Sequence, residues 1–226
     1  MSNGLFITSS GTEIGKTYVT RLLCRQLRDQ GKSVRAVKPV MSGYDESAPE
    51  QSDAGLILES LGVEVTERTI AEICPWRFRA AIAPDMAARR EGKDIPFDSL
   101  VAFCAGARSE SGDAVLVEGA GGVMAPVTAE KLCVDLIAAI ALPALVVVGS
   151  YLGTISHCLT AVTTLHNHEI PIAGIVVSES QENPVPLDQT ASAIKRHLGG
   201  TPLVVLARRP IDAWRDQPDL TWLLNG

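Results

Sequence analysis

Aromatic residues, histidines and paired cysteines are scarce in this sequence. Aromatic side chains make up 4% of the 226 residues, and the histidine count is 4. The 5 cysteines include no Cys-x-x-Cys pair, so we expect buried, reduced thiols rather than disulfides or a cysteine metal site. His166 and His168 lie two positions apart in a predicted helix and point in different directions, which argues against a shared metal ion.

Long basic runs and long apolar segments are absent as well. The formal net charge is −6 and no long basic run occurs, which argues against nucleic acid as the main partner. No basic segment followed by an apolar stretch marks a secretory signal near Met1. The apolar stretch 132–148 is interrupted by Asp135 and Pro143, so it predicts a helix and a buried strand rather than a membrane span. We therefore expect a cytoplasmic protein that binds neither nucleic acid nor membrane.

Strand and helix patterns alternate along most of the chain. The runs 114–117 and 144–148 are apolar at every position, which is typical of parallel strands buried on both faces. The alternation predicts a single α/β domain over residues 1–226, with a doubly wound, mostly parallel sheet and helices on both faces. The predicted strands are 5–8, 34–40, 69–74, 114–118, 145–149, 172–177 and 203–206. The predicted helices are 16–30, 53–61, 85–91, 97–109, 134–140, 155–168 and 187–198.

Gly15-Lys16-Thr17 follows the first predicted strand and opens a helix. The free N–H groups of a helix N-terminus bind anions, a lysine neutralises phosphate charge, and a threonine hydroxyl can ligate Mg²⁺. The segment therefore predicts a P-loop NTPase-like nucleotide site. The strict P-loop spacing requires glycine at position 10, where this chain has serine, so an ordinary helix start is the alternative.

Polar loops follow the carboxyl ends of several predicted strands, which is where ligands bind in parallel sheets. Lys38 ends one strand and could neutralise a transferred phosphoryl group. Glu118 ends an apolar strand, where a buried carboxylate is costly unless it is paired or metal-bound, and we expect it opposite Thr17 as a Mg²⁺ ligand. The loops predicted to meet at this edge are 12–17, 38–43, 118–122 and 149–154.

Each of these residues also has a plainer interpretation. Lys38 could be a solvated surface lysine, and the loop after Glu118 could be a tight turn. Asp53 begins a predicted helix, so it could cap the helix N-terminus, bind a metal ion, or do both. The helix start at Gly153-Thr154 could bind a carboxylate through free N–H groups, or could simply begin a helix.

Together these motifs resemble those of the dethiobiotin synthetase family, in order and spacing, over about residues 5–180. The matching segments are Thr12-Glu13-Ile14-Gly15-Lys16-Thr17, Lys38-Pro39-Val40-Met41-Ser42-Gly43, Ser52-Asp53-Ala54, Glu118-Gly119-Ala120-Gly121-Gly122 and Gly153-Thr154-Ile155. The resemblance implies an ATP- and Mg²⁺-dependent homodimer that converts 7,8-diaminononanoate and CO₂ to dethiobiotin, ADP and phosphate. It also implies the route. One amine forms a carbamate, the carbamate oxygen attacks the γ-phosphate to give a carbamic–phosphoric anhydride, and the second amine closes the ring.

The resemblance further implies a role for each site residue. Lys16 and Lys38 would be catalytic, because they would neutralise charge on the transferring phosphate. Thr17, Asp53 and Glu118 would hold Mg²⁺. The implied nucleotide-binding residues are Glu13, Ile14, Gly15, Lys16, Thr17, Tyr18, Asp53, Glu118, Gly119, Ala120, Gly121 and Ser178. The implied substrate-binding residues are Thr12, Lys38, Ser42, Gly122, Gly153 and Thr154. Of these, Gly153 and Thr154 would come from the second subunit and hold the substrate carboxylate.

The chain departs from the family pattern in several places. Ser9 and Gly11 replace the usual loop residues, and Ser156 stands where asparagine is typical. Ser178 lies in a segment where the family reads adenine with an asparagine, and residues 206–210 lack the usual Gly-x-x-Pro form. We therefore predict weak discrimination among nucleoside triphosphates.

Two other functions fit a fold of this kind. An amidoligase of the cobyrinate amidase type would carry a nucleophilic cysteine in a glutaminase domain, and no cysteine follows Cys158. A ParA-like ATPase switch would carry a signature lysine early in the phosphate loop and a basic DNA-binding face, and neither is evident. Trp214 and Trp222 are expected either to pack on the core or to flank the nucleotide base.

Overall fold

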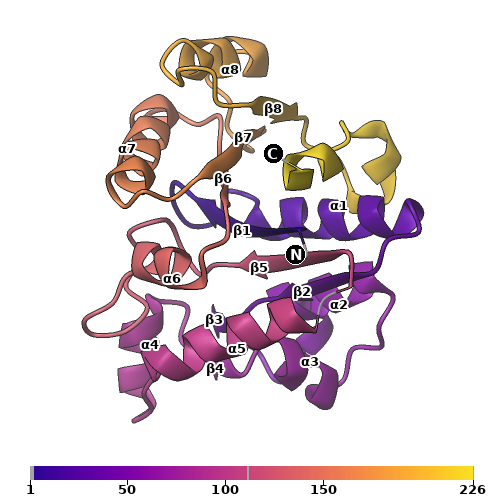
Figure 1. The fold of residues 1–226 in the computed structure, drawn as a ribbon, viewed down its shortest axis with the longest axis vertical. Helices are drawn as coiled ribbons and strands as arrows, with labels where there is room; N and C mark the ends of the chain where they lie inside the picture. Colours follow the sequence, from indigo (N-terminus) through magenta and orange to yellow (C-terminus); the bar gives the residue numbers. More distant parts are fainter. Residues whose placement is uncertain (1–2, 111, 226) are drawn as a thin grey trace.

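A six-stranded sheet, parallel at every described strand pair, forms the centre of the molecule (Figure 1). The computed structural model describes residues 3–110 and 112–225, so Met1, Ser2, Ser111 and Gly226 of the predicted domain lie outside the described residues. In spatial order, the strands are β2 (Val34–Val37), β5 (Ala114–Glu118), β1 (Asn3–Ser9), β6 (Ala144–Val148), β7 (Ile172–Ser178) and β8 (Leu203–Leu206).

Helices cover both faces of this sheet, as the alternation of strands and helices predicted. Right-handed crossovers place α1, in the connection from β1 to β2, on one face, and the helices that directly precede β5, β6, β7 and β8 on the other. Figure 1 accordingly shows α6 and α7 on the opposite side of the sheet from α1. The elements on the α1 side include α1 (Lys16–Asp29), α2 (Asp53–Leu61) and two 3₁₀ segments, η2 (Ile211–Asp216) and η3 (Thr221–Asn225). The crossovers on the other face carry α5 (Phe97–Ser109), α6 (Cys133–Ile140), α7 (Thr154–Asn167) and α8 (Leu187–Lys195).

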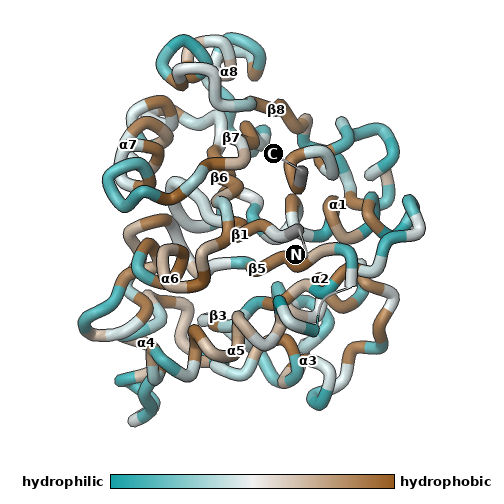
Figure 2. Tube along the Cα trace, viewed as in Figure 1, coloured by the Kyte–Doolittle hydropathy of each residue, from teal (hydrophilic) through white to brown (hydrophobic). Residues whose placement is uncertain are grey.

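The apolar strand runs form the core. Every residue of β5 and β6 is buried, which confirms the prediction of strands covered on both faces. Figure 2 shows the hydrophobic residues gathered along the strands, while hydrophilic residues dominate the outer loops. Among the described residues, no helix combines the length and hydropathy needed to cross a bilayer.

A small excursion between β2 and β5 differs from the sequence prediction. The predicted strand 34–40 stops at Val37, because Pro39 has no N–H to donate and the Lys38 N–H donates to the carbonyl oxygen of Ile73 at 3.0 Å. The chain then forms a separate two-stranded sheet of β3 (Val40–Ser42) and β4 (Trp76–Phe78). The same excursion contains three short helical segments, of which the last packs on both strands of the small sheet: η1 (Pro49–Gln51), α3 (Glu67–Ile73) and α4 (Pro84–Arg90).

The predicted strand 69–74 is wrong, because most of this segment belongs to α3. Thr66 caps the helix: its side chain accepts a hydrogen bond from the Thr69 N–H, and the Thr69 side chain accepts one from the Thr66 N–H. This reciprocal capping box begins a helix in a stretch whose β-branched residues favour a strand.

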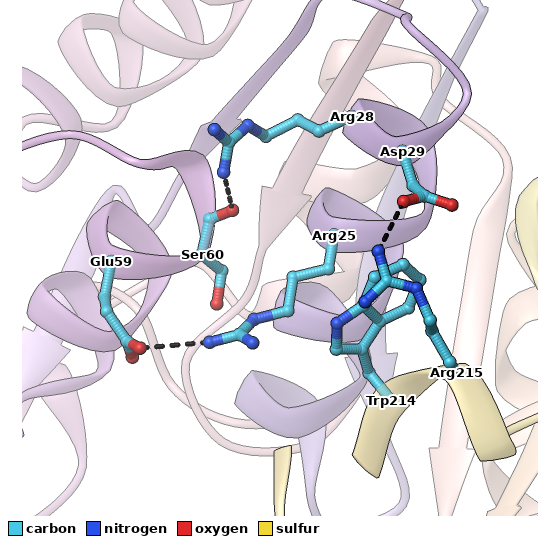
Figure 3. Close-up of a pocket in the computed structure, with 7 residues that line it drawn as sticks. All are labelled: Arg25, Arg28, Asp29, Glu59, Ser60, Trp214 and Arg215. Atoms are coloured by element: carbon cyan, nitrogen blue, oxygen red, sulfur yellow. Dashed lines mark hydrogen bonds and ion pairs between the residues drawn. The ribbon is translucent and has the colours of Figure 1, made fainter. Parts of the chain in front are cut away.

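The C-terminal segment is attached to the outer surface of α1 by charged side chains (Figure 3). Arg215 of η2 pairs with Asp29 at 2.7 Å and stacks over the Trp214 ring at 4.2 Å. Arg25, also on α1, pairs with Glu59 of α2 at 3.0 Å in the same hollow. Trp214 packs against the core beneath this network. Packing on the core is one of the two roles predicted for this residue.

Candidate nucleotide and substrate site

A pocket of about 760 Å³ lies at the carboxyl ends of β1, β2 and β5. The chain leaves β1 towards β2 along one face and leaves β5 towards β6 along the other, and a crevice forms where such connections diverge. Three of the four predicted loops therefore meet here. The predicted site residues that line the pocket are Thr12, Glu13, Ile14, Gly15, Lys16, Thr17, Lys38, Ser42, Asp53, Ala120 and Gly121.

Gly15 ends the loop after β1 and caps the first turn of α1. Its φ of 100° lies in the left-handed region, which glycine adopts without strain. A Cβ at this position would also lie 2.9 Å from the Ser178 Oγ. Glycine therefore lets the loop pack closely against Ser178 where α1 begins, and the first N–H groups of a helix, which have no partner within it, bind anions readily.

Lys16 begins α1, and its side chain is buried among polar atoms of the loops. Its Nζ donates to the Ser9 Oγ at 3.1 Å and to the Gly11 carbonyl oxygen at 3.4 Å. Burial, together with the positive charge of Lys38, lowers the pKa of Lys16 to about 8. A cation held in this way is only partly compensated by the protein, so an anionic ligand would be favoured beside it.

Glu118, at the end of β5, is fully buried and is the centre of a polar cluster. Its Oε1 accepts hydrogen bonds from the Lys38 Nζ at 2.7 Å and from the Thr17 Oγ1 at 2.8 Å. Its Oε2 accepts one from the Thr20 Oγ1 at 2.6 Å. The Lys38 Nζ also contacts the Asp53 Oδ2 at 3.0 Å. Two carboxylates, two hydroxyls and an ammonium group thus meet beside the phosphate loop.

The charged groups in this cluster shift one another's pKa values. Burial alone would lower the pKa of Lys38, but the carboxylates of Glu118 and Asp53 outweigh it and raise this pKa above its usual value. Burial would raise the pKa of Asp53, but the Lys38 ammonium holds it below its usual value. Lys38 is therefore a paired cation and not a solvated surface lysine, since its exposed fraction is 4%.

Asp53 is the first residue of α2 but does not cap it. The N-cap is Ser52, whose Oγ accepts the Gly55 N–H at 3.0 Å. The Asp53 carboxylate is therefore available to the Lys38 side chain and to the pocket. The capping role that was predicted as one alternative for Asp53 therefore belongs to Ser52. The metal-binding role of Asp53 stays a prediction.

The oxygen atoms of Thr17, Asp53 and Glu118 suit Mg²⁺, which prefers hard oxygen donors. Two of these side chains are linked directly at 2.8 Å, and Lys38 joins the third to them. In the part of the chain that the structure describes, no cluster of three or more His, Cys, Asp or Glu side chains could hold a metal ion. Mg²⁺ is commonly bound by one or two carboxylates, waters and substrate phosphates, so this small donor set fits it.

Comparison with known proteins covers almost the whole chain. A family model described as an AAA domain matches residues 3–211. The ATP-dependent dethiobiotin synthetase BioD of Methylobacterium nodulans is 50% identical over 200 residues, which span 86% of this chain and 89% of that protein. The chain belongs to the dethiobiotin synthetase family. The resemblance inferred from the motifs is thereby confirmed.

Solved structures confirm the fold of this dethiobiotin synthetase family member. MinD from Pyrococcus horikoshii, complexed with Mg-ADP, superimposes with a TM-score of 0.59 at 14% identity, covering 99% of this chain and 93% of that chain. The signal recognition particle receptor FtsY from Elizabethkingia anophelis gives 0.55 at 13% identity, covering 100% of this chain and 65% of that chain. At such low identity these likenesses concern the P-loop NTPase-like fold alone.

Several residues implied by the family resemblance lie beside the pocket rather than in its lining. The Gly119 carbonyl oxygen accepts a hydrogen bond from the Lys38 Nζ at 3.1 Å. Gly122 packs tightly on the loop after β1, since a Cβ there would lie 3.1 Å from the Gly11 nitrogen. Ser178 lies behind Gly15. The Tyr18 hydroxyl accepts a hydrogen bond from the Gln217 side chain at 2.8 Å.

Gly153 and Thr154 lie in a different hollow. The loop 150–156, α7 and the segment 184–185 line this hollow, which measures about 890 Å³. The Thr154 hydroxyl donates to the Gly149 carbonyl oxygen at 2.8 Å, and Leu152 beside it has an exposed fraction of 88%. Within one chain, the structure therefore does not bring these two residues to the phosphate-loop pocket.

The sequence analysis missed two hydroxyls that belong to this family member's site. The Ser9 Oγ lies 3.1 Å from the Gly121 carbonyl oxygen and so joins the loop after β1 to the loop after β5. Thr20 contacts Glu118. The spacing of Thr17 and Thr20, three apart on α1, places them on the same helix face and could have indicated the second contact.

Proposed function

We propose that this chain is an ATP- and Mg²⁺-dependent dethiobiotin synthetase that forms a cyclic urea from 7,8-diaminononanoate and CO₂. The observation that carries the proposal is the cluster of Lys38, Asp53 and Glu118 beside the phosphate loop, in a chain 50% identical to a curated synthetase. Such a cluster offers a cation for a transferring phosphoryl group and oxygen ligands for the metal ion that accompanies ATP.

ATP is proposed to bind with its phosphates at the N-terminus of α1. The first N–H groups of this helix have no partner within it, and Lys16 provides a buried positive charge there. Bound Mg²⁺, held by Thr17, Asp53 and Glu118, would supply further charge neutralisation at the phosphates. Glu13, Ile14, Ala120 and Gly121 would complete the wall. Tyr18, Gly119 and Ser178 remain part of the proposed nucleotide site, with Ser178 close to Gly15 and Gly119 bonded to Lys38.

The reaction is proposed to run in three steps. One amine of the substrate adds to CO₂ and loses a proton, which gives a carbamate. A carbamate oxygen attacks the γ-phosphorus and ADP leaves, which gives a carbamic–phosphoric anhydride. The second amine attacks the carbamate carbon, loses a proton and displaces phosphate. Thr12, Ser42 and the loop at Gly122 would hold the diamine and the carbamate, while Lys16 and Lys38 neutralise the charge that develops on the phosphoryl group.

We further propose that the active protein is a homodimer in which the partner completes the substrate site. The hollow around Gly153 and Thr154 has a mostly apolar wall, and the Leu152 side chain projects with an exposed fraction of 88%. A contiguous exposed apolar surface of this kind is typical of protein–protein interaction sites. The first turn of α7 in the partner would then hold the substrate carboxylate.

A cytoplasmic location and a single domain also belong to this proposal. All five cysteines in the described residues are free, as expected of a reducing compartment. The sheet combines strands from the first and the last thirds of the chain, with β1 between β5 and β6 and with β8 at an edge.

The experiment is product formation by the purified protein. It is incubated with 7,8-diaminononanoate, bicarbonate, ATP and Mg²⁺, and the cyclic urea is detected by mass spectrometry. We expect product from the wild type, none from Lys16→Ala or Lys38→Ala, and wild-type yields from Lys195→Ala, an exposed lysine on α8. ADP binding without product in the wild type would show a nucleotide site that serves another substrate.

A further inference from the structure

Thr20 is a fully buried threonine of α1 that the proposed mechanism does not use. Its Oγ1 lies 2.6 Å from the Glu118 Oε2 and 3.0 Å from the carbonyl oxygen of Lys16, four residues earlier. A threonine hydroxyl has one proton, so it donates to one of these two acceptors at a time. Hydrogen bonds to a carboxylate are shorter and stronger than those between neutral groups, and the shorter of the two distances is the one to Glu118.

The two oxygen atoms of Glu118 have different surroundings. Oε1 accepts from Thr17 and Lys38, on the side that faces Asp53. Oε2 points the other way, and among the residues that the structure describes its one donor is Thr20. The Thr20 contact therefore fixes the Oε2 end of the carboxylate, while Lys38 and Thr17 hold the Oε1 end.

We propose that Thr20 is a positioning residue for the metal ion, because its hydroxyl fixes Glu118 Oε2 and thereby directs Oε1 towards the Thr17 Oγ1. The inference rests on the proposed function, since it takes Glu118 and Thr17 as Mg²⁺ ligands. Partners that orient a metal ligand commonly change metal affinity by about 10- to 100-fold when they are removed. Thr20 does not itself touch the nucleotide, so its effect appears only when Mg²⁺ is present.

Calorimetry with ADP as the probe can measure this effect. The dissociation constant of ADP is determined in excess EDTA and at increasing Mg²⁺, and the Mg²⁺ concentration that half-saturates the change is compared among variants. Thr20→Val keeps the shape and removes the hydroxyl, Thr20→Ser restores the hydroxyl, and Thr20→Ala removes it with less bulk. Ser109→Ala is the matched control for the loss of a hydroxyl, because Ser109 is exposed on α5 and makes the same backbone contact, to the Ala105 carbonyl oxygen at 3.1 Å, without a carboxylate.

We expect Thr20→Val and Thr20→Ala to need about 10- to 100-fold more Mg²⁺ than the wild type, with ADP affinity in EDTA unchanged. Thr20→Ser and Ser109→Ala should behave like the wild type. A purely structural role would lower the unfolding temperature without moving the Mg²⁺ midpoint, and that result overturns the inference. Loss of folding in both hydroxyl-deleted variants overturns it too, since a positioning residue leaves a folded protein.

The same titration separates this inference from the proposed function. If wild-type ADP binding does not respond to Mg²⁺ at all, the metal assignment fails and the role of Thr20 fails with it. Dethiobiotin formation by the wild type is scored independently, so the activity can stand when the positioning role does not. Product formation with a normal Mg²⁺ midpoint in Thr20→Val would be that outcome.

Discussion

Lys38→Met is expected to leave a buried carboxylate without its cation. The Lys38 Nζ lies 2.7 Å from the Glu118 Oε1 and 3.0 Å from the Asp53 Oδ2. The Glu118 side chain is 0% exposed, whereas the Asp53 side chain is 42% exposed. Solvent screens Asp53, so most of the destabilisation should come from Glu118.

The size of this effect can be estimated in two ways. Removing one partner of a buried ion pair typically destabilises a protein by about 3–5 kcal/mol. A carboxyl group can also take up a proton instead, and for a glutamate side chain of ordinary acidity this costs about 3.7 kcal/mol at pH 7. Because the folded variant follows whichever route costs less, proton uptake sets the upper limit of the destabilisation. We therefore expect a loss of about 3–4 kcal/mol in the free energy of unfolding at pH 7.

The pH dependence has a definite sign. In the variant the folded state holds a proton that the unfolded state releases, so its relative stability falls as the pH rises. The cost of that proton decreases by about 1.4 kcal/mol for each unit of lower pH, which leaves a difference from the wild type of about 1 kcal/mol at pH 5. Added Mg²⁺ should restore part of the loss, because it supplies positive charge at the same carboxylates.

Urea unfolding in EDTA at pH 7 and pH 5 measures these quantities, with Lys195→Met as the control on an exposed lysine. A variant within about 1 kcal/mol of the wild type at pH 7 would refute the reasoning, because the buried pair would then not be a strong interaction. A difference that stays constant between the two pH values would refute the proton uptake.

Three further predictions concern the nucleotide and the partner subunit. The pKa of Lys16 is lowered to about 8, and phosphate binding needs the charged form of this lysine. The affinity for ADP in EDTA, measured by calorimetry, should therefore fall by up to about tenfold per pH unit above pH 8 in the wild type. In Lys16→Met it should not change with pH over this range. Leu152→Glu places a charge on the exposed apolar patch, so sedimentation should show monomers and product formation should fall while ADP binding persists; an unchanged dimer would contradict the assigned interface. Ser178→Asn should raise the preference for ATP over CTP in binding assays, and a wild-type preference above about a hundredfold would contradict the predicted weak discrimination.

Much of the fold could be predicted because the strands are chemically uniform. The apolar runs of β5 and β6 carry no period that suits a surface helix, and both are buried throughout. The excursion between β2 and β5 could not be predicted in the same way. Residues 69–74 contain β-branched side chains typical of a strand, and the capping box at Thr66 and Thr69 makes them helical.

The site was predictable where the sheet alone positions it. Lys38 directly follows β2 and Glu118 ends the neighbouring strand β5, and the pairing of these strands brings the two residues together. The cap on α2 could not be assigned to Ser52 rather than Asp53, because both residue types occur at helix N-termini. The burial of Lys16 and the rotation of the Glu118 side chain depend on three-dimensional packing that no short motif records.

The most direct test of the central claim is the fate of the bicarbonate oxygen. The protein is mixed with 7,8-diaminononanoate, ATP, Mg²⁺ and freshly dissolved ¹⁸O-labelled bicarbonate, and the products are analysed by mass spectrometry before the label exchanges with water. If the carbamate oxygen attacks the γ-phosphorus, the cyclic urea forms together with phosphate that carries one ¹⁸O atom. Phosphate without ¹⁸O, or ATP hydrolysis without the cyclic urea, would contradict the account.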